Sequence, residues 1–405
     1  MELVIKYQMF KLSSIASALL AMQAAALDQV TVNPETRMFE DPEGRTLIFH
    51  GQNVVYKTDP YIPSDGDFDP DNSLNDKDIA DLIGWGQNFV RLGVMWEAVE
   101  RTAGKYDEAY LDKVEALINK LGQAGIYTLV DMHQDVFARS ICGEGFPDFY
   151  AKEAIKGAVC INETWDWIFG WMYEHLGFCK SIRDYDGMNF DENDDPIITD
   201  CQKNLFGLYY TTKESFSAFD ALFSNKDGLQ DKFIAYWDHT SARFAKNPYV
   251  VGYDPFNEPL VGNPLHDLWL EEPGVADRDL LDPLYSKIFE KYMKNDDKSV
   301  MWFEPPPQPD TLPIAGGMVS PVGFTTPPGA QIGSPNHVLN EHTYCCAMDY
   351  DSGVCENEEP TPAGAESCMK FHRAKLSTRS ADAKRLKIPL FISEFGACFN
   401  EGPCT

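Results

Sequence analysis

YDPFNEP, residues 253–259, follows the apolar run 249–252, and this stretch decides the fold. The apolar run is typical of a buried strand, and the polar residues Asn257 and Glu258 come soon after it. A second apolar run, 389–393, ends in the same way at Glu394. Polar groups that follow parallel strands meet at one end of an α/β barrel, where the functional residues of such folds lie. The two runs therefore predict a barrel with Glu258 and Glu394 at its mouth.

Further apolar runs alternate with segments of helical spacing, as expected for βα units and a parallel sheet. We predict seven strands, at residues 47–54, 88–92, 127–133, 250–257, 299–304, 337–344 and 390–394. Residues 110–122 have apolar positions at helical spacing, and Gly122 and Gly125 close this predicted helix. A chain of 405 residues exceeds the roughly 250 needed for one such barrel, so insertions are expected. We find no repeat and no second domain.

A complete barrel of this type has eight strands, one more than we predict. Glu394 is followed by only eleven residues, 395–405. We therefore expect an α/β fold of the (β/α)8 TIM-barrel type that is truncated before its eighth strand, or that another element closes. A β-sandwich following the barrel is expected to be absent as well.

The segment from about 140 to 225 is too long for a simple connection and follows the third predicted strand, so we expect it to overhang the mouth. It contains the acidic run 191–195 and the aromatic residues Trp165, Trp167, Trp171 and Tyr173. These aromatics fit a packed lid or a groove for a lipid, and packing is the commoner use. Residues 305–335 are rich in proline and glycine and predict another mouth loop.

The formal net charge of −29 argues against nucleic acid as a partner, because phosphate binding needs a basic surface. It argues equally against electrostatic docking on anionic lipid. A neutral substrate, or one presented by its sugar, fits this charge better. A role in solubility alone explains the acidity as well.

Residues 1–26 have the pattern of a secretory signal peptide. Lys6 and Lys11 precede the short apolar run 15–26, which ends in three alanines. We expect cleavage near Ala26, a catalytic domain over 27–405, and a secreted or lumenal protein; an N-terminal helix is the alternative. No other stretch is long enough to cross a membrane, so stable membrane insertion is not expected.

Ten cysteines fit an oxidising compartment, and none forms a CxxC pair. Because most lie outside the predicted strands, we expect them to form disulfides in loops, with the pairing left open. Asn162-Glu163-Thr164 is a glycosylation sequon, which has meaning only in a secreted chain.

Two carboxylates at strand ends suit a retaining glycosidase. One donates a proton to the leaving oxygen, and the other attacks the sugar carbon as an anion, with the two groups about 5–5.5 Å apart. Two carboxylates suffice, so neither a metal nor an organic cofactor is expected. Glu304 also ends a predicted strand and is the rival carboxylate, although a structural or substrate contact explains it more readily. Asn-Glu-Pro on its own is also a common helix start.

The ordered motifs resemble glycoside hydrolase family 5, which has Asn-Glu-Pro, His-x-Tyr and Glu-Phe-Gly, found here at 257–259, 342–344 and 394–396. DMHQDVF (131–137), CGEGFP (142–147) and ISEFG (392–396) resemble its endoglycoceramidase-related branch. The resemblance covers about residues 45–399. It implies a retaining β-glycosidase that cuts the glycan–ceramide linkage of a glycosphingolipid. A glucosylceramide-restricted β-glucosidase, a galactosyl-preferring relative, a β-glucanase and a non-catalytic glycan-binding barrel stay open, as does the oligomeric state.

The resemblance also implies residue roles. Glu258 would be the acid/base and Glu394 the nucleophile. The substrate-binding residues would be Lys57, Arg91, His133, Asp135, Asn257, His342 and Tyr344. Among them, Arg91 would keep Glu394 ionised and Tyr344 would donate a hydrogen bond to it. By residue type alone, Lys57 also fits a solvated loop and Asp135 a turn cap. The family's tryptophan platform follows an eighth strand, beyond the printed sequence.

Overall fold

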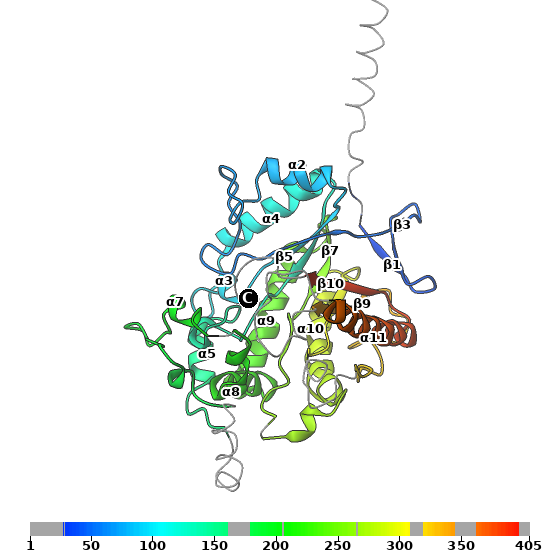
Figure 1. Cartoon of the computed structure of the whole chain (residues 1–405). Helices are drawn as coiled ribbons and strands as arrows, with labels where there is room; N and C mark the ends of the chain where they lie inside the picture. Colours follow the sequence, from blue (N-terminus) through cyan, green and yellow to red (C-terminus); the bar gives the residue numbers. More distant parts are fainter. Residues whose placement is uncertain are drawn as a thin grey trace, which may run out of the picture.

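The fold is taken from a computed structural model, which describes residues 27, 29–160, 179–204, 206–264, 266–307, 319–344 and 362–396. One seven-stranded sheet forms the centre of the molecule (Figure 1). Its strands are all parallel and follow one another in chain order. They are β4 (Gly51–Val54), β5 (Phe89–Gly93), β6 (Tyr127–Asp131), β7 (Val250–Asp254), β8 (Met301–Phe303), β9 (His337–Tyr344) and β10 (Leu390–Gly396). This nearly closed barrel confirms the predicted fold class.

Each predicted strand lies where the sequence placed it, but the first one begins later. Thr46–Leu47 is β3 of a separate sheet, and β4 begins only at Gly51. A Cβ at Gly51 would lie 1.7 Å from the backbone oxygen of Phe89, so only glycine allows the two strands to approach this closely.

The barrel has a seam between β4 and β10, which are the two edges of the sheet. Across this seam the side chain of Asn53 donates a hydrogen bond of 3.1 Å to the backbone oxygen of Ser393. No further strand pairs with either edge in the described part of the chain. The sequence-based expectation of seven strands is therefore confirmed for these residues.

Helices lie on the outside of the barrel, with α4, α9, α10 and α11 beside the strands (Figure 1). The predicted helix at 110–122 is α4; it begins at Glu108, where the Asp107 side chain accepts from the backbone N–H of Tyr110. The α-helices are α2 (Asp76–Gly84), α3 (Trp96–Val99), α4 (Glu108–Gln123), α5 (Asp148–Ala154), α7 (Ile198–Cys201), α8 (Lys213–Phe223), α9 (Leu229–Phe244), α10 (Asp282–Asn295) and α11 (Pro362–Leu386).

Shorter helical turns occupy the connections. They are η1 (Arg139–Ile141), η3 (Ile182–Asp184), η4 (Phe206–Thr211), η5 (Lys226–Gly228), η6 (Leu268–Glu271) and η7 (Asp277–Leu281). None of the helices in the described residues combines the length and the apolar character that crossing a membrane requires.

A small antiparallel sheet covers the end of the barrel where the strands begin. It consists of β1 (Thr31–Asn33), β2 (Met38–Glu40) and β3, and the sequence did not predict it. Phe39 of β2 stacks on Trp302 at a centroid distance of 5.1 Å and also packs on Phe49. Because this apolar cluster fills the end at which the strands start, the polar groups collect at the opposite end, the mouth.

The long insertion after β6 is held by two disulfides, Cys142–Cys201 and Cys160–Cys179. These pairs confirm the expectation of disulfides in loops for four of the cysteines. The predicted signal peptide 1–26, Asn162, the aromatics at 165–173, and the residues Cys345, Cys346, Cys355, Cys398 and Cys404 lie outside the described residues.

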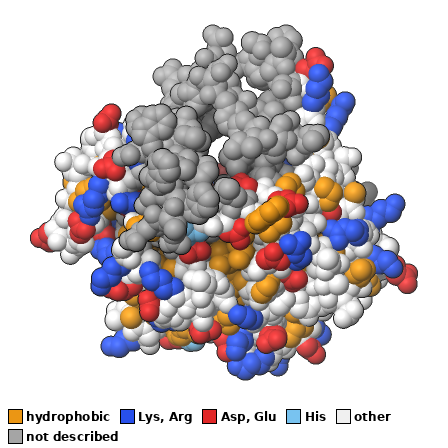
Figure 2. Space-filling view, turned by 90° about the horizontal axis from the view of Figure 1, so that it is seen from below, with side chains coloured by type: hydrophobic (Ala, Val, Ile, Leu, Met, Phe, Trp, Pro, Cys, Tyr) orange, Lys and Arg blue, Asp and Glu red, His pale blue; other side chains and the backbone are white. Residues whose placement is uncertain are grey.

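Acidic and basic side chains are interspersed on the face that Figure 2 shows, rather than gathered into one basic patch.

Candidate active site

Arg91 on β5 is the buried centre of the mouth, with 0% of its surface exposed. Its guanidinium donates to Glu394 Oε1 at 2.5 Å, to Asn257 Oδ1 at 2.8 Å and to Asp254 Oδ2 at 2.8 Å. One side chain thus links the ends of β5, β7 and β10. A planar guanidinium suits this role, because its fork of donors reaches several oxygens at fixed angles.

The charge of Arg91 is balanced by buried carboxylates. Asp131 Oδ1 and Glu304 Oε1 lie 3.1 Å and 3.2 Å from Nη2, beside Asp254. Burial disfavours the charged guanidinium, but the charges of Asp131 and Asp254 outweigh it and raise the pKa of Arg91. A buried ion of this kind is tolerated only when it is paired and hydrogen-bonded. Arg91 is therefore a fixed cation in the mouth.

Glu394 ends β10 beside an irregularity in the strand. The register with β9 shifts between Ile392 and Glu394, which is how a β-bulge re-aims a side chain. Tyr344 Oη donates to Glu394 Oε2 at 2.6 Å, and Arg91 holds the other oxygen. Burial raises the pKa of Glu394, but the charges of His342 and Arg91 outweigh it and lower that pKa. Glu394 is therefore held as an anion.

Glu258 lies in a strained turn after β7, with a φ of 37°, in the left-handed region that a non-glycine residue rarely adopts. Glu304 Oε2 accepts its backbone N–H at 2.9 Å. Gln134 Nε2 donates to the carbonyl oxygens of Asn257 and Glu258 at 2.6 Å and 3.2 Å. Surrounding side chains thus fix the turn from both sides, as strained functional residues require.

Glu258 and Glu394 face each other across His342. A carboxylate oxygen of each and a ring nitrogen of His342 all lie within 4.8 Å of one another. His342 Nδ1 lies 2.8 Å from Glu258 Oε1 and 3.6 Å from Glu394 Oε2. Burial lowers the pKa of His342, but Glu304 and Glu394 outweigh burial and raise that pKa. A cationic imidazole therefore stands beside both carboxylates.

The rival carboxylate, Glu304, is only 2% exposed. Its oxygens accept from the backbone of Glu258, from Arg91 Nη2 and from Asn340 Nδ2, and lie 3.1 Å from His342 Nε2. Burial raises its pKa, but the charges of His342 and Arg91 outweigh burial and lower it to about 2. The side chain of Glu304 is 3% exposed and that of Glu394 is 12% exposed, so Glu304 is the less accessible of the two to a sugar and supports the site instead.

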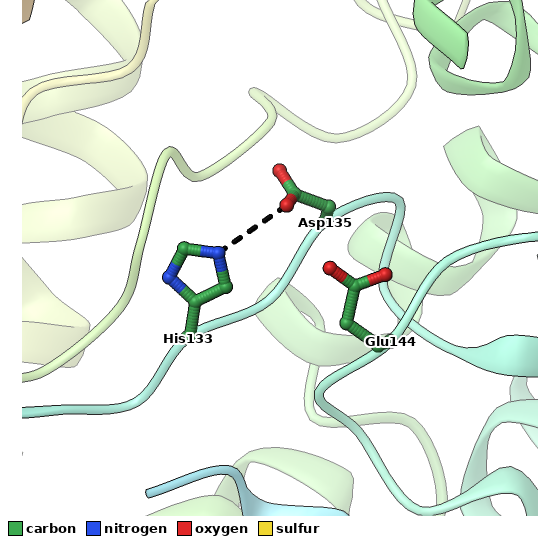
Figure 3. A group of neighbouring side chains, drawn as sticks. All are labelled: His133, Asp135 and Glu144. Carbon is green, nitrogen blue, oxygen red and sulfur yellow. Dashed lines mark ion pairs between the residues drawn. The ribbon is translucent and has the colours of Figure 1, made fainter. Parts of the chain in front are cut away.

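A second polar cluster lies at the ends of β4 and β6, and Figure 3 shows three of its members. The Lys57 ammonium forms an ion pair with Asp135, and it also lies 2.8 Å from the carboxyl group of Glu144. His133 Nε2 lies 3.3 Å from Asp135 Oδ2, and Tyr210 Oη donates to Asp135 Oδ1 at 3.1 Å. Burial opposes ionisation of Asp135, but Lys57 outweighs it and lowers the pKa of Asp135.

The loop 142–147 places Glu144 in this cluster. Backbone hydrogen bonds of 3.2 Å and 2.8 Å join Asp135 and Glu144 as an antiparallel bridge. A Cβ on Gly143 would lie 2.0 Å from the carbonyl oxygen of Asp135, and Gly145 has a φ of 118°. The Cys142–Cys201 disulfide ties the loop to α7, farther along the same insertion. The glycines of this motif thus bring the carboxyl group of Glu144 onto Lys57.

The two clusters form one network. Asp131 connects them, because His133 Nδ1 lies 2.9 Å from its Oδ2 and Arg91 Nη2 lies 3.1 Å from its Oδ1. The structure thereby brings together every predicted site residue: Lys57, Arg91, His133, Asp135, Asn257, Glu258, His342, Tyr344 and Glu394.

Several members were not identified from the sequence. Asp131 and Glu144 lie inside motifs that were noted, but no role was assigned to them. Tyr210 comes from η4 in the insertion, and no local pattern marks it.

Among the residues that the structure describes, two groups of donor atoms are close enough to hold a cation: His133, Asp135 and Glu144, and the triad of Glu258, His342 and Glu394. Lys57 already supplies a positive charge to the first group. Arg91 and His342 supply it to the second. We assign no metal to either.

Glu258 and Glu394 divide the mouth into two halves, since β7 and β10 separate β4–β6 from β8–β9 in the barrel. The Lys57 cluster occupies the first half. The second half holds an open pocket with an empty volume of about 430 Å³, open solvent included. Its lining includes Glu258, Tyr344, Pro307, Phe371 and Lys375.

Comparison with known proteins identifies the family. The model of the cellulase family, glycosyl hydrolase family 5, matches residues 62–170 and 210–405. The chain belongs to this family. The resemblance found in the strand-end motifs is thus confirmed.

Two curated relatives extend the comparison. An endoglycoceramidase of Cyanea nozakii is 34% identical over 298 residues, 74% of this chain and 55% of the relative. An endoglycoceramidase of Hydra vulgaris is 33% identical over 377 residues, 92% of this chain and 63% of the relative. The chain thus spans a little more than half the length of these relatives.

A solved structure of endo-glycoceramidase II from a Rhodococcus species, in complex with ganglioside GM3, superposes with a TM-score of 0.60. It is 20% identical in sequence, and the match covers 87% of this chain and 67% of that chain. At 20% identity the similarity supports the fold alone, and that fold agrees with the barrel described above.

Proposed function

We propose that this family 5 chain is a retaining β-glycosidase that hydrolyses the glycan–ceramide linkage of glycosphingolipids. The observation that carries the proposal is the approach of Glu258 and Glu394, since one carboxylate oxygen of each lies within 4.8 Å of the other. Retaining enzymes place these groups about 5–5.5 Å apart, whereas inverting enzymes leave about 6.5–9.5 Å for a water molecule. The short separation favours direct attack of a carboxylate on the sugar.

In the first step, Glu394 attacks the anomeric carbon. Arg91 and Tyr344 hold its two oxygens, so the attacking anion is oriented before the substrate arrives. Glu258 donates its proton to the glycosidic oxygen as the bond to the leaving group breaks. The products of this step are a free leaving alcohol and a glycosyl ester of Glu394.

In the second step, Glu258, now an anion, takes a proton from water. The resulting hydroxide attacks the anomeric carbon from the face that the leaving group vacated, and Glu394 is released. Two inversions give a product with retained β configuration. His342, 2.8 Å from Glu258 Oε1, orients the carboxyl group of Glu258 in both steps.

The two halves of the mouth suit the two parts of the substrate. Lys57, His133, Asp135 and Asn257 offer charged and polar groups for the hydroxyls of the sugar. The pocket beyond Glu258, with Phe371 and Pro307 in its lining, suits a more apolar leaving group. Ceramide as that leaving group is supported by the relatives named endoglycoceramidase.

We further propose that residues 1–26 are a cleaved signal peptide and that the domain over 27–405 is secreted or lumenal. The small-residue pattern that ends near Ala26 supports this proposal, as do the two disulfides, since disulfides persist in oxidising compartments.

The experiment that tests the function is mass spectrometry of the products from secreted 27–405 protein, incubated separately with a ganglioside and with glucosylceramide. Glu394→Gln serves as the matched control. Ceramide plus an intact oligosaccharide is the expected result. Ceramide from glucosylceramide alone would assign a glucosidase instead. A folded protein that forms no product would favour a glycan-binding barrel.

A further inference from the structure

Glu304 is only 2% exposed, and it contacts Glu258, His342 and Arg91. Given the proposed function, we infer that Glu304 is a positioning residue that acts through Glu258 and His342. It holds the acid/base carboxyl group in the orientation that proton donation to the leaving group needs.

The first contact fixes the backbone of Glu258. The N–H of Glu258 donates to Glu304 Oε2 at 2.9 Å, and a charged acceptor makes this a strong hydrogen bond. The φ of 37° at Glu258 is unfavourable for a residue with a side chain, and such a conformation persists only where the surroundings impose it. Without the acceptor, the turn is expected to relax and the carboxyl group of Glu258 to change direction.

The second contact runs through His342. Nε2 of its ring lies 3.1 Å from Glu304 Oε1, and Nδ1 lies 2.8 Å from Glu258 Oε1. An imidazolium donates from both nitrogens, so it can bridge two carboxylates in this way. Glu304 therefore fixes the side chain of Glu258 as well as its backbone.

The charges that face His342 come from three neighbouring strand ends. They are Glu258 after β7, Glu304 after β8 and Glu394 on β10, where Ser393 Oγ also contacts Nε2 at 2.9 Å. Helix α11 packs on β9 through Glu341, the residue before His342, to which Lys375 and Arg379 are paired. Among the causes that raise the pKa of His342, the charge of Glu304 is the largest.

Donors face both oxygens of Glu304, and the carboxyl group of Asp254 is a further neighbour. Oε2 accepts from Glu258, while Oε1 accepts from Arg91 Nη2 at 3.2 Å and from Asn340 Nδ2 at 3.1 Å. A glutamine would turn one of these acceptors into a donor and direct it at another donor. Glu304→Gln therefore removes a contact with almost no change of volume.

The test compares Glu304→Gln with wild type on two glycosides of the same sugar. One substrate is a 2,4-dinitrophenyl glycoside, which needs no acid, and the other is an alkyl glycoside, which does. We expect kcat/KM on the alkyl substrate, which reports the first step, to fall about 10²-fold, the scale of general acid catalysis. On the activated substrate kcat/KM is expected to fall less than about 10-fold, while kcat and KM fall together because the second step still needs Glu258 as base.

Asp131→Asn is the matched control, because it also removes a buried carboxylate beside Arg91. Among the described residues, the hydrogen bonds and ion pairs of the Asp131 side chain are to Arg91 and His133, and none is to Glu304, Glu258 or His342. Its loss is expected to be similar on both substrates. Glu304→Asp is the second variant; it keeps the charge that balances Arg91 and shortens the reach to Glu258, and it is expected to reproduce the selective loss if Glu304→Gln does not fold.

The pH profile provides an independent readout. In Glu304→Gln, His342 loses the charge that raises its pKa most, so its pKa is lower than in wild type. The alkaline decrease of kcat is therefore expected at a lower pH in the variant. Equal losses on both substrates with an unchanged pH profile would overturn the inference and leave the proposed function standing. An inactive wild-type protein would overturn the proposed function and this inference with it.

Discussion

Tyr344 Oη donates a hydrogen bond of 2.6 Å to Glu394 Oε2. The phenol comes from the end of β9 and the carboxylate from β10, two strands that pair in parallel. Burial and the charge of Glu394 raise the pKa of Tyr344, so the phenol keeps its proton and stays a donor. The orientation and charge of the Glu394 carboxylate therefore depend on the hydrogen bond from Tyr344.

The first prediction concerns this pair. Glu394→Gln should lower kcat on the order of 10⁴-fold or more, because no nucleophile remains. Tyr344→Phe should cost about 10–100-fold in kcat, the value of one hydrogen bond to a charged group. Steady-state kinetics on an aryl β-glycoside measures both. Turnover at the wild-type rate in Glu394→Gln would remove Glu394 from the mechanism.

The second prediction concerns the acid/base. Glu258→Ala should slow poor leaving groups most, since it removes the proton donor. Azide should partly restore turnover of an activated aryl glycoside, because a small anion can enter the space left by the carboxylate and needs no base. NMR of the product should show a glycosyl azide of β configuration; an α-azide would contradict a retaining mechanism.

The third prediction concerns Glu144. Burial and the charge of Asp135 raise its pKa to about 8, so it is largely protonated at neutral pH. Glu144→Ala should raise KM about 10-fold, the scale of one hydrogen bond to a charged group, because Lys57 loses one of the two groups that orient it. Glu144→Gln should resemble wild type at pH 6, since an amide imitates the protonated acid.

The control for Glu144 is Glu153→Gln, on the exposed surface of α5, where the side chain is 67% exposed. This substitution should leave KM unchanged. A Glu144→Ala variant with wild-type KM would show that Lys57 is oriented without Glu144.

The fourth prediction concerns stability. Burial lowers the pKa of His133, but the charge of Asp131 outweighs it and raises the pKa from 6.5 to about 10. A raised folded-state pKa stabilises the fold fully below pH 6.5, and this contribution is lost as the pH rises towards 10. The free energy of unfolding should therefore fall on the order of 1 kcal/mol between pH 6.5 and 8.

Urea unfolding at both pH values measures this loss. His133→Gln should show a smaller decrease over the same range, although His342 still contributes in the same direction. An equal decrease in the variant and the wild type would mean that His133 does not carry this part of the pH dependence.

The barrel and its strand-end residues could be predicted because both depend on local pattern. An apolar run predicts a strand, and the polar residue that follows it predicts which side chain lies at the barrel mouth. Glu258 and Glu394 were predicted in this way. The approach of these residues then follows from the geometry of parallel strands, without knowledge of any loop.

Other features depend on contacts between distant segments, and no local pattern reveals them. Tyr210 reaches Asp135 across 75 positions in sequence. The strands β1–β3 are only two or three residues long, too short to show a period. Glu304 was visible as a strand-end carboxylate, but its part in the site depends on which donors face each of its oxygens.

The seam of the barrel has a mechanical consequence. Glu394 stands on an edge strand, and the described backbone ladder supports that strand only from β9, while Asn53 holds the far side through one amide. An opening fluctuation at this place would carry the nucleophile away from Arg91, whereas the acid/base, on the interior strand β7, would stay in place. The distance between the two carboxylates is therefore limited by the stability of β10, the edge strand. Backbone amides of β10 should exchange with deuterium sooner than those of the interior strand β6.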